Sequence, residues 1–164
     1  MKRNIVFKTL IDILFIFQGF GILGAFLIMP FGVTKINQIN LNVSEWPITY
    51  WSLLVLSLIA FIVFITGVFF LRKVGRYLLS NQYFAIEVID NLKKSGRFFI
   101  YTGIISFSVF VISWVVKFNS GNVLLYNTDV VLPLFITIVG LFFLIQSDVL
   151  MVSKNAKEDN DLTI

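Results

Sequence analysis

The chain has 164 residues, of which 58% are apolar, 16% are aromatic and only 13% are charged. Soluble domains usually carry about 25% charged residues, and the core of one small soluble domain cannot hold nineteen Phe side chains. The chain contains no Cys and no His, which excludes disulfides, thiolate metal sites, Cys nucleophiles and the usual proton shuttle. Membrane topology explains the net charge of +4 better than binding to nucleic acid does.

Four apolar runs are long enough to cross a membrane, which requires about 20 helical residues. They cover residues 10–33, 48–71, 98–116 and 130–152. Backbone polar groups in lipid must be satisfied within each span, so isolated runs of this kind are predicted to be helices. The length favours a single domain over residues 1–164. The expected fold class is therefore all-α, an integral-membrane bundle of four helices.

The basic residues predict how these spans are oriented. Eleven lie before the first run, between the second and third, or after the fourth: Lys2, Arg3, Lys8, Arg72, Lys73, Arg76, Lys93, Lys94, Arg97, Lys154 and Lys157. The other two loops contain only Lys35 and Lys117. This asymmetry predicts that both termini and the loop 72–97 are cytoplasmic. The expected location is the inner membrane of a bacterium.

The loop 72–97 contains an apolar pattern of helical period. Phe84, Val88 and Leu92 recur at intervals of four within residues 82–94, QYFAIEVIDNLKK, and would share one face of a helix. The caps predicted for this helix are Ser80, Asn81 and Gly96. We expect a short amphipathic helix at the membrane surface or under the bundle. A solvated connector between spans is the alternative interpretation.

Four charged residues lie near the cytoplasmic ends of the predicted spans: Asp12, Arg72, Arg97 and Asp148. An ionisable group inside a span is costly unless it is paired or reaches water, and their similar depth would allow them to form one cluster. Three interpretations remain open, namely a structural clasp at the helix ends, a ligand or partner site, and ion translocation. No second charge lies deep in the core, which argues against a pump or channel.

No set of residues indicates a catalytic, cofactor-binding or metal-binding site, and the protein is not expected to be an enzyme. Residues 19–24, GFGILG, match the glycine pattern of dinucleotide-binding proteins. That motif requires a preceding strand and a soluble βαβ unit, whereas here it lies within a predicted span. Gly21 and Ala25 are better explained by close packing between membrane helices.

Three motifs resemble a bacterial membrane family known as domain of unknown function 2975. They are FAIEVIDNLKKSG at 84–96, GLFFLIQSDVL at 140–150 and EDNDLTI at 158–164. Two positions depart from the family's pattern. Asp148 stands where Glu is usual, and Tyr83 and Ala85 stand beside the Phe where Pro or Ser is typical. The resemblance implies four spans with both ends inside, no established activity, and genes that often lie beside those of small helix-turn-helix regulators.

We therefore expect a non-enzymatic regulatory or binding protein that docks a small cytosolic DNA-binding regulator and does not itself contact nucleic acid. The predicted docking surface comprises Phe84, Val88, Leu92, Asp161, Leu162 and Ile164. Leu162 and Ile164 are expected to be buried in an apolar groove, which would order the tail 153–164. The alternatives are a small-solute binding or transport protein with a polar cavity near Asp148, and an immunity-type membrane protein. The oligomeric state stays open.

Overall fold

Four long helices make up the protein in a computed structural model that describes residues 2–28, 48–119 and 130–161. The helices are α1 (Lys2–Ile28), α2 (Ile48–Leu79), α3 (Ile86–Asn119) and α4 (Val131–Asp161). Each is long and apolar enough to cross a membrane, and many of their Phe, Leu and Ile side chains are exposed on the outside. Lipid is the solvent that suits such a surface. The protein is a multi-pass membrane protein.

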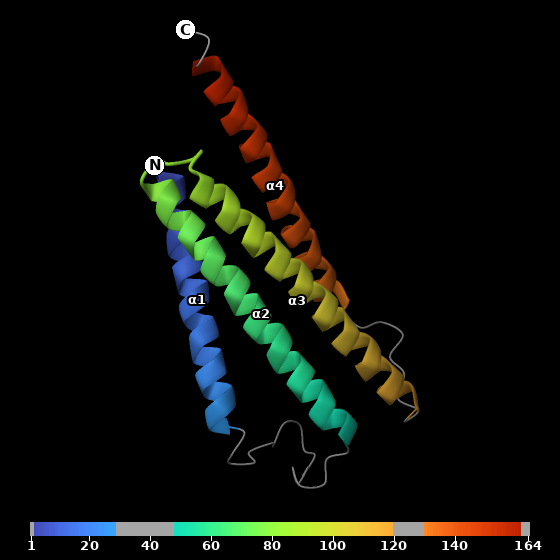
Figure 1. Cartoon of the computed structure of the whole chain (residues 1–164). Helices are drawn as coiled ribbons and strands as arrows, with labels where there is room; N and C mark the ends of the chain where they lie inside the picture. The colour runs from blue at the N-terminus through green and yellow to red at the C-terminus, as the bar shows by residue number, and fades with distance from the viewer. Residues whose placement is uncertain (1, 29–47, 120–129, 162–164) are drawn as a thin grey trace.

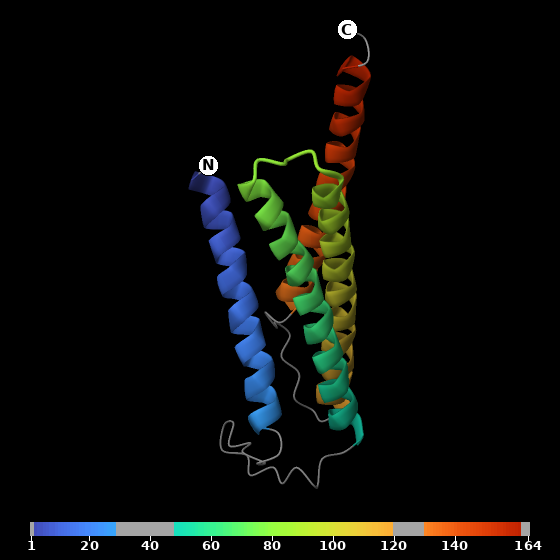
Figure 2. The ribbon, with the colours of Figure 1, turned by 60° about the vertical axis from the view of Figure 1, so that its left-hand side comes forward.

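The helices pack in chain order, α1 on α2, α2 on α3 and α3 on α4 (Figure 1). In the described part of the chain, the backbone of α1 approaches neither α3 nor α4, so the bundle is open between its first and last helices. The start of α1, the α2–α3 connection and the end of α4 lie at one end of the molecule (Figure 2). We call this the basic end, because the eleven basic residues named above lie in the parts of the helices nearest to it.

The core lies in the half of the bundle nearest the basic end. Its buried residues come from three helices: Ile11, Val68, Leu71, Val74, Val88, Leu92 and Phe99. Stacked rings extend it sideways, since the Phe99 ring lies 5.4 Å from Phe64 on α2 and 5.7 Å from Phe143 on α4, measured between centroids. Helix α3 contacts both α2 and α4 more extensively than α1 contacts α2.

The connection between α2 and α3 begins with a hydrogen-bonded helix terminus. The Gln82 N–H donates to the Tyr77 carbonyl at 3.2 Å, and the Asn81 N–H donates to the Leu78 carbonyl at 3.4 Å. Asn81 has a φ of 58°, the left-handed conformation that closes helices in this way and that Asn tolerates better than most residues. Ser80 and Asn81 therefore end α2, and they do not begin the next helix as the sequence analysis predicted.

The structure also corrects the prediction of a separate amphipathic helix. Residues 86–97 are the first turns of α3, which continues without a break to Asn119. Val88 is 1% exposed and Leu92 is 8% exposed, because they pack against the neighbouring helices and not against the membrane surface. Val88 and Leu92 lie on the buried face of this long helix, whereas Phe84, the first residue of the predicted apolar pattern, precedes the helix and is exposed. Gly96 lies within α3 and does not end a helix.

The contact between α3 and α4 depends on glycine. A Cβ atom added to Gly140 would lie 2.8 Å from the Gly96 carbonyl oxygen, and one added to Gly96 would lie 2.7 Å from the Gly140 oxygen. A Cβ on Gly103 would lie 2.9 Å from the Pro133 oxygen. The two backbones therefore touch along a line that we call the glycine seam: Gly96, Gly103 and Gly140. Close approach of this kind provides van der Waals contact where lipid removes the hydrophobic driving force.

Two buried serines near the seam are expected to respond differently to the same substitution. The Ser95 hydroxyl donates to the Gly67 carbonyl on α2 at 2.9 Å, whereas the Ser147 hydroxyl has no hydrogen-bond partner in the described structure. Both side chains are fully buried. Ser95→Ala should lower the free energy of unfolding by about 1 kcal/mol, while Ser147→Ala should leave it unchanged or raise it. Reversible unfolding in detergent measures both, and equal losses would contradict the assignment.

Candidate functional site

An ion-paired carboxylate joins α1 to α2 near the basic end. Asp12 Oδ2 lies 2.5 Å from Lys8 Nζ, and Asp12 Oδ1 accepts a hydrogen bond from Arg72 Nε at 2.6 Å. The Asp12 side chain is only 17% exposed, and the guanidinium carbon of Arg72 lies 5.2 Å from the centroid of the Phe15 ring. We call Lys8, Asp12 and Arg72 the Asp12 cluster. One carboxylate is thus shared by two cations at the boundary between the two helices.

The surrounding contacts hold α1 close to α2 around this cluster. A Cβ on Gly75 would lie 3.5 Å from the Lys8 Cα, so the glycine leaves room for the α1 backbone. Nearer the basic end, Asn4 Nδ2 donates to the Leu78 carbonyl at 3.1 Å and to the Tyr83 hydroxyl at 2.8 Å. These contacts make the cluster one of several polar attachments that fix α1.

The structure brings together only two of the four charged residues that the sequence analysis grouped. Asp12 pairs with Arg72, but Asp148 is 72% exposed and lies 3.8 Å from Lys93 Nζ. Arg97 is exposed and forms no ion pair in the described ranges. In the part of the chain that the structure describes, no three acidic side chains lie close enough together to hold a metal ion. The polar groups are therefore divided between the α1–α2 and α3–α4 contacts.

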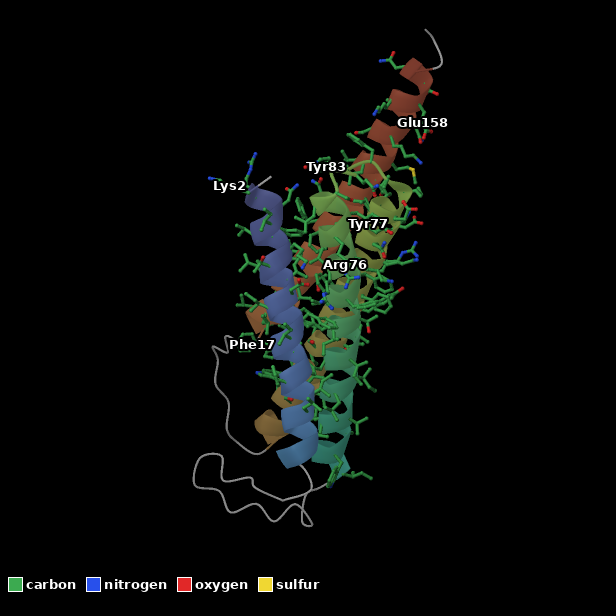
Figure 3. The ribbon with its side chains drawn as sticks, turned by 90° about the vertical axis from the view of Figure 1, so that its left-hand side faces the viewer. Lys2, Phe17, Arg76, Tyr77, Tyr83 and Glu158 are labelled. Carbon is green, nitrogen blue, oxygen red and sulfur yellow. The ribbon has the colours of Figure 1, made fainter. Side chains whose placement is uncertain are left out.

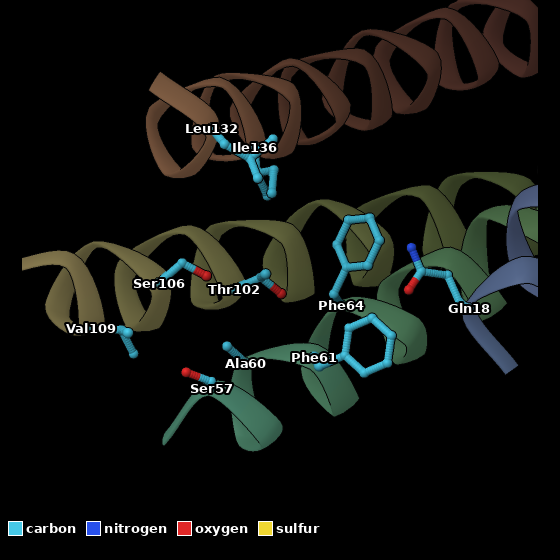
Figure 4. Close-up of a pocket in the computed structure, with 10 residues that line it drawn as sticks. All are labelled: Gln18, Ser57, Ala60, Phe61, Phe64, Thr102, Ser106, Val109, Leu132 and Ile136. Atoms are coloured by element: carbon cyan, nitrogen blue, oxygen red, sulfur yellow. The ribbon is translucent and has the colours of Figure 1, made fainter. Parts of the chain in front are cut away.

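An open cavity of about 390 Å³ lies between the helices, further from the basic end than the Asp12 cluster. Figure 4 shows the residues that line it. All four helices contribute to its lining: Gln18, Ser57, Ala60, Phe61, Phe64, Thr102, Ser106, Val109, Leu132 and Ile136. Ser57 and Thr102 donate hydrogen bonds to carbonyls of their own helices. The side-chain amide of half-buried Gln18 makes no hydrogen bond to another described residue. The cavity is therefore mainly apolar with a few polar groups.

Sequence reasoning missed this cavity. Its polar residues lie on three helices and are far apart in the chain, so no spacing in the sequence connects them. Gln18 carries the one available signal, because an amide within a membrane span requires a partner or a polar cavity. That signal places a polar group in the bundle interior, but it does not indicate which other helices face it.

The predicted docking residues fall into four groups. Phe84 is 44% exposed in the α2–α3 connection, next to exposed Tyr83, whereas Val88 and Leu92 are buried in the core and are not available to a partner. Helix α4 continues to Asp161 and projects past the other helices at the basic end, as the position of Glu158 in Figure 3 shows. Leu162 and Ile164 lie outside the described residues.

The geometry defines a class of protein, an open four-helix membrane bundle with a basic end, a projecting last helix and an interhelical cavity. The chain belongs to the family described as protein of unknown function DUF2975, whose profile matches residues 35–164. This match confirms the resemblance that the three motifs indicated. It includes α2, α3 and α4 and begins after α1. No curated protein and no solved structure matches the chain.

Proposed function

We propose that the protein is a non-enzymatic binding protein of the bacterial inner membrane, with its basic end in the cytoplasm. Eleven basic residues lie toward this end, and in the described helices Lys117 is the only one toward the other. Cytoplasmic ends of membrane proteins carry such an excess of Lys and Arg. Both termini and the α2–α3 connection would then be in contact with cytosolic partners.

The observation that carries the proposal is the projecting end of α4. Its 31 residues correspond to about 46 Å of helix, whereas the hydrocarbon layer is about 30 Å thick. The residues from Ser153 to Asn160 are exposed apart from half-buried Lys154. They include acids and bases, such as the Lys154–Glu158 pair at 3.6 Å. These last turns of α4 are not needed to cross the bilayer, and they offer a polar surface to a partner.

The α2–α3 connection supplies exposed apolar groups at the same end (Figure 3). Tyr83, Phe84 and Ile86 are all exposed there, and aromatic side chains are typical anchors of protein interfaces. We define the docking surface as these three residues together with residues 153–160 of α4. Its partner is a small cytosolic DNA-binding regulator, the class that the family resemblance implies.

Removal of residues 157–164 is expected to release this partner. Affinity purification from membranes should recover a small DNA-binding polypeptide with the intact chain, but not with the truncated chain. Phe84→Ser should weaken the same interaction, since it removes the most exposed aromatic ring of the connection. Phe20→Ser, which alters an exposed ring on α1 far from the basic end, is the matched control. Identical partner sets for all four proteins would refute the docking surface.

The interhelical cavity favours a second candidate function, the binding of a small solute. Its volume of about 390 Å³ lies in the range of ligand sites, which are mostly apolar with a few polar groups. The site proposed from the sequence was beside Asp148, but the depression there is formed by α4 alone. The same purification separates the proposals. A retained small molecule that survives truncation would favour solute binding, and a captured membrane toxin would favour an immunity function.

A further inference from the structure

Two lysines from neighbouring helices approach one aromatic ring on the surface of α2 and α3. Lys73 Nζ lies 5.5 Å from the centroid of Phe70 and 4.7 Å from that of Phe69. Lys94 Nζ lies 5.8 Å from the same Phe70 centroid. Cation–π contacts hold each ammonium group near the ring, so Lys73 and Lys94 place two positive charges around one aromatic side chain.

The described structure provides no carboxylate for either lysine. Asp12 is paired with Lys8 and Arg72, and Asp148 with Lys93. Asp90, one turn before Lys94, forms no ion pair with it. Two like charges at one ring without a counter-ion repel each other, and a bound anion would offset that repulsion.

A third cation and an apolar surface adjoin this pair. Arg97 is exposed one helical turn after Lys94 and shares its helix face. We call Lys73, Lys94 and Arg97 the cationic patch. Further from the basic end, Phe98 stacks on Phe70 with centroids 5.6 Å apart. Exposed Tyr101 and Ile104 continue this surface along α3.

We propose that the cationic patch binds the phosphate of an anionic phospholipid, whose acyl chains lie along the apolar surface of Phe98, Tyr101 and Ile104. Basic pockets between membrane helices near a bilayer surface suit such headgroups. Charge-assisted hydrogen bonds from two ammonium groups to phosphate oxygens are stronger than those between neutral groups. Phosphatidylcholine carries its own cation, which the patch repels. The site is independent of the docking surface and of the interhelical cavity.

Titration with phosphatidylglycerol and with phosphatidylcholine tests the site. Native mass spectrometry of the protein in a non-ionic detergent gives the apparent Kd for each lipid. The unmodified protein should bind phosphatidylglycerol more tightly than phosphatidylcholine. Lys73→Gln with Lys94→Gln should weaken the binding of phosphatidylglycerol about thirtyfold. Lys73→Arg with Lys94→Arg should retain the binding of phosphatidylglycerol. This result would show that binding depends on the two positive charges and that substitution at these positions leaves the helices folded.

A second pair of lysines at the basic end is the matched control. Lys154→Gln with Lys157→Gln removes the same charge from the projecting part of α4, and it should change the apparent Kd by less than about twofold because distant charges are screened. An equal loss in this control, or no loss in the first double variant, would overturn the proposal. Inorganic phosphate is the remaining arm. Competition by phosphate at the concentration of the lipid would show a site for free anions and would equally overturn it.

Discussion

Replacement of Gly140 by Ala should lower the free energy of unfolding by about 3 kcal/mol. The new Cβ would lie 2.8 Å from the Gly96 carbonyl oxygen and 2.9 Å from the Ile100 backbone nitrogen. Neither backbone atom can move without separating α3 from α4, so one methyl group would separate the helices along the glycine seam. Reversible unfolding in detergent, followed by circular dichroism, measures the loss.

Gly19 provides the control for this experiment. A Cβ at this position would meet nothing within 4 Å. Gly19→Ala should leave stability unchanged or raise it by up to about 1 kcal/mol, because Ala restricts the unfolded chain more than Gly does and favours a helix. The two substitutions add the same atoms to a membrane helix. Equal effects would show that the seam is not a close contact.

Asp12→Leu should cost about 2 kcal/mol and loosen α1. The substitution leaves Lys8 and Arg72 next to each other without the carboxylate that both contact at 2.5 and 2.6 Å. The figure lies below the range for a fully buried pair, since all three side chains are partly exposed. Unfolding of the single and double variants gives the coupling energy. Asp12→Leu with Arg72→Leu should recover part of the loss, because it leaves only Lys8 unpaired, whereas Asp12→Leu alone leaves two like charges side by side.

The Lys154–Glu158 pair is the control for the Asp12 cluster. It lies at 3.6 Å on the projecting end of α4, where Glu158 is well exposed. Lys154→Leu should change stability by less than about 1 kcal/mol, as expected for a pair in contact with solvent. A loss of stability as large as that of Asp12→Leu would show that burial between α1 and α2 does not strengthen the ion pairs of Asp12.

The number and order of the helices could be predicted from sequence, but their ends could not. Length and apolarity identify residues that must lie in lipid, and these runs were found. A helix need not end where the lipid does. Arg72 and Arg76 are good helix formers, and α2 continues to Leu79. At the other end of the predicted loop 72–97, Gly96 could have been a helix cap or a packing contact, and only the position of Gly140 on another helix decides between them.

The charged residues show a similar limit. Their approximate depth in the membrane could be predicted from their positions in the chain, but the neighbouring helix that each side chain faces could not. Arg72 faces α1 and meets Asp12, whereas Asp148 faces outward toward Lys93. A one-turn difference separates Lys93 from Arg97, and apolar spacing alone does not say which of them an acid on the next helix will reach. Which charged residues form ion pairs depends on how the helices contact one another, and the sequence alone does not show those contacts.

The continuity of α4 has a mechanical consequence. The helix packs closely against α3 at Gly140, and its end at Asp161 lies about 30 Å further along the axis at about 1.5 Å per residue. A tilt of about 10° at the seam would move that end by roughly 5 Å. Because α4 is unbroken from Val131 to Asp161, such a tilt would move its projecting end as one rigid body, without any change in the fold of the helix.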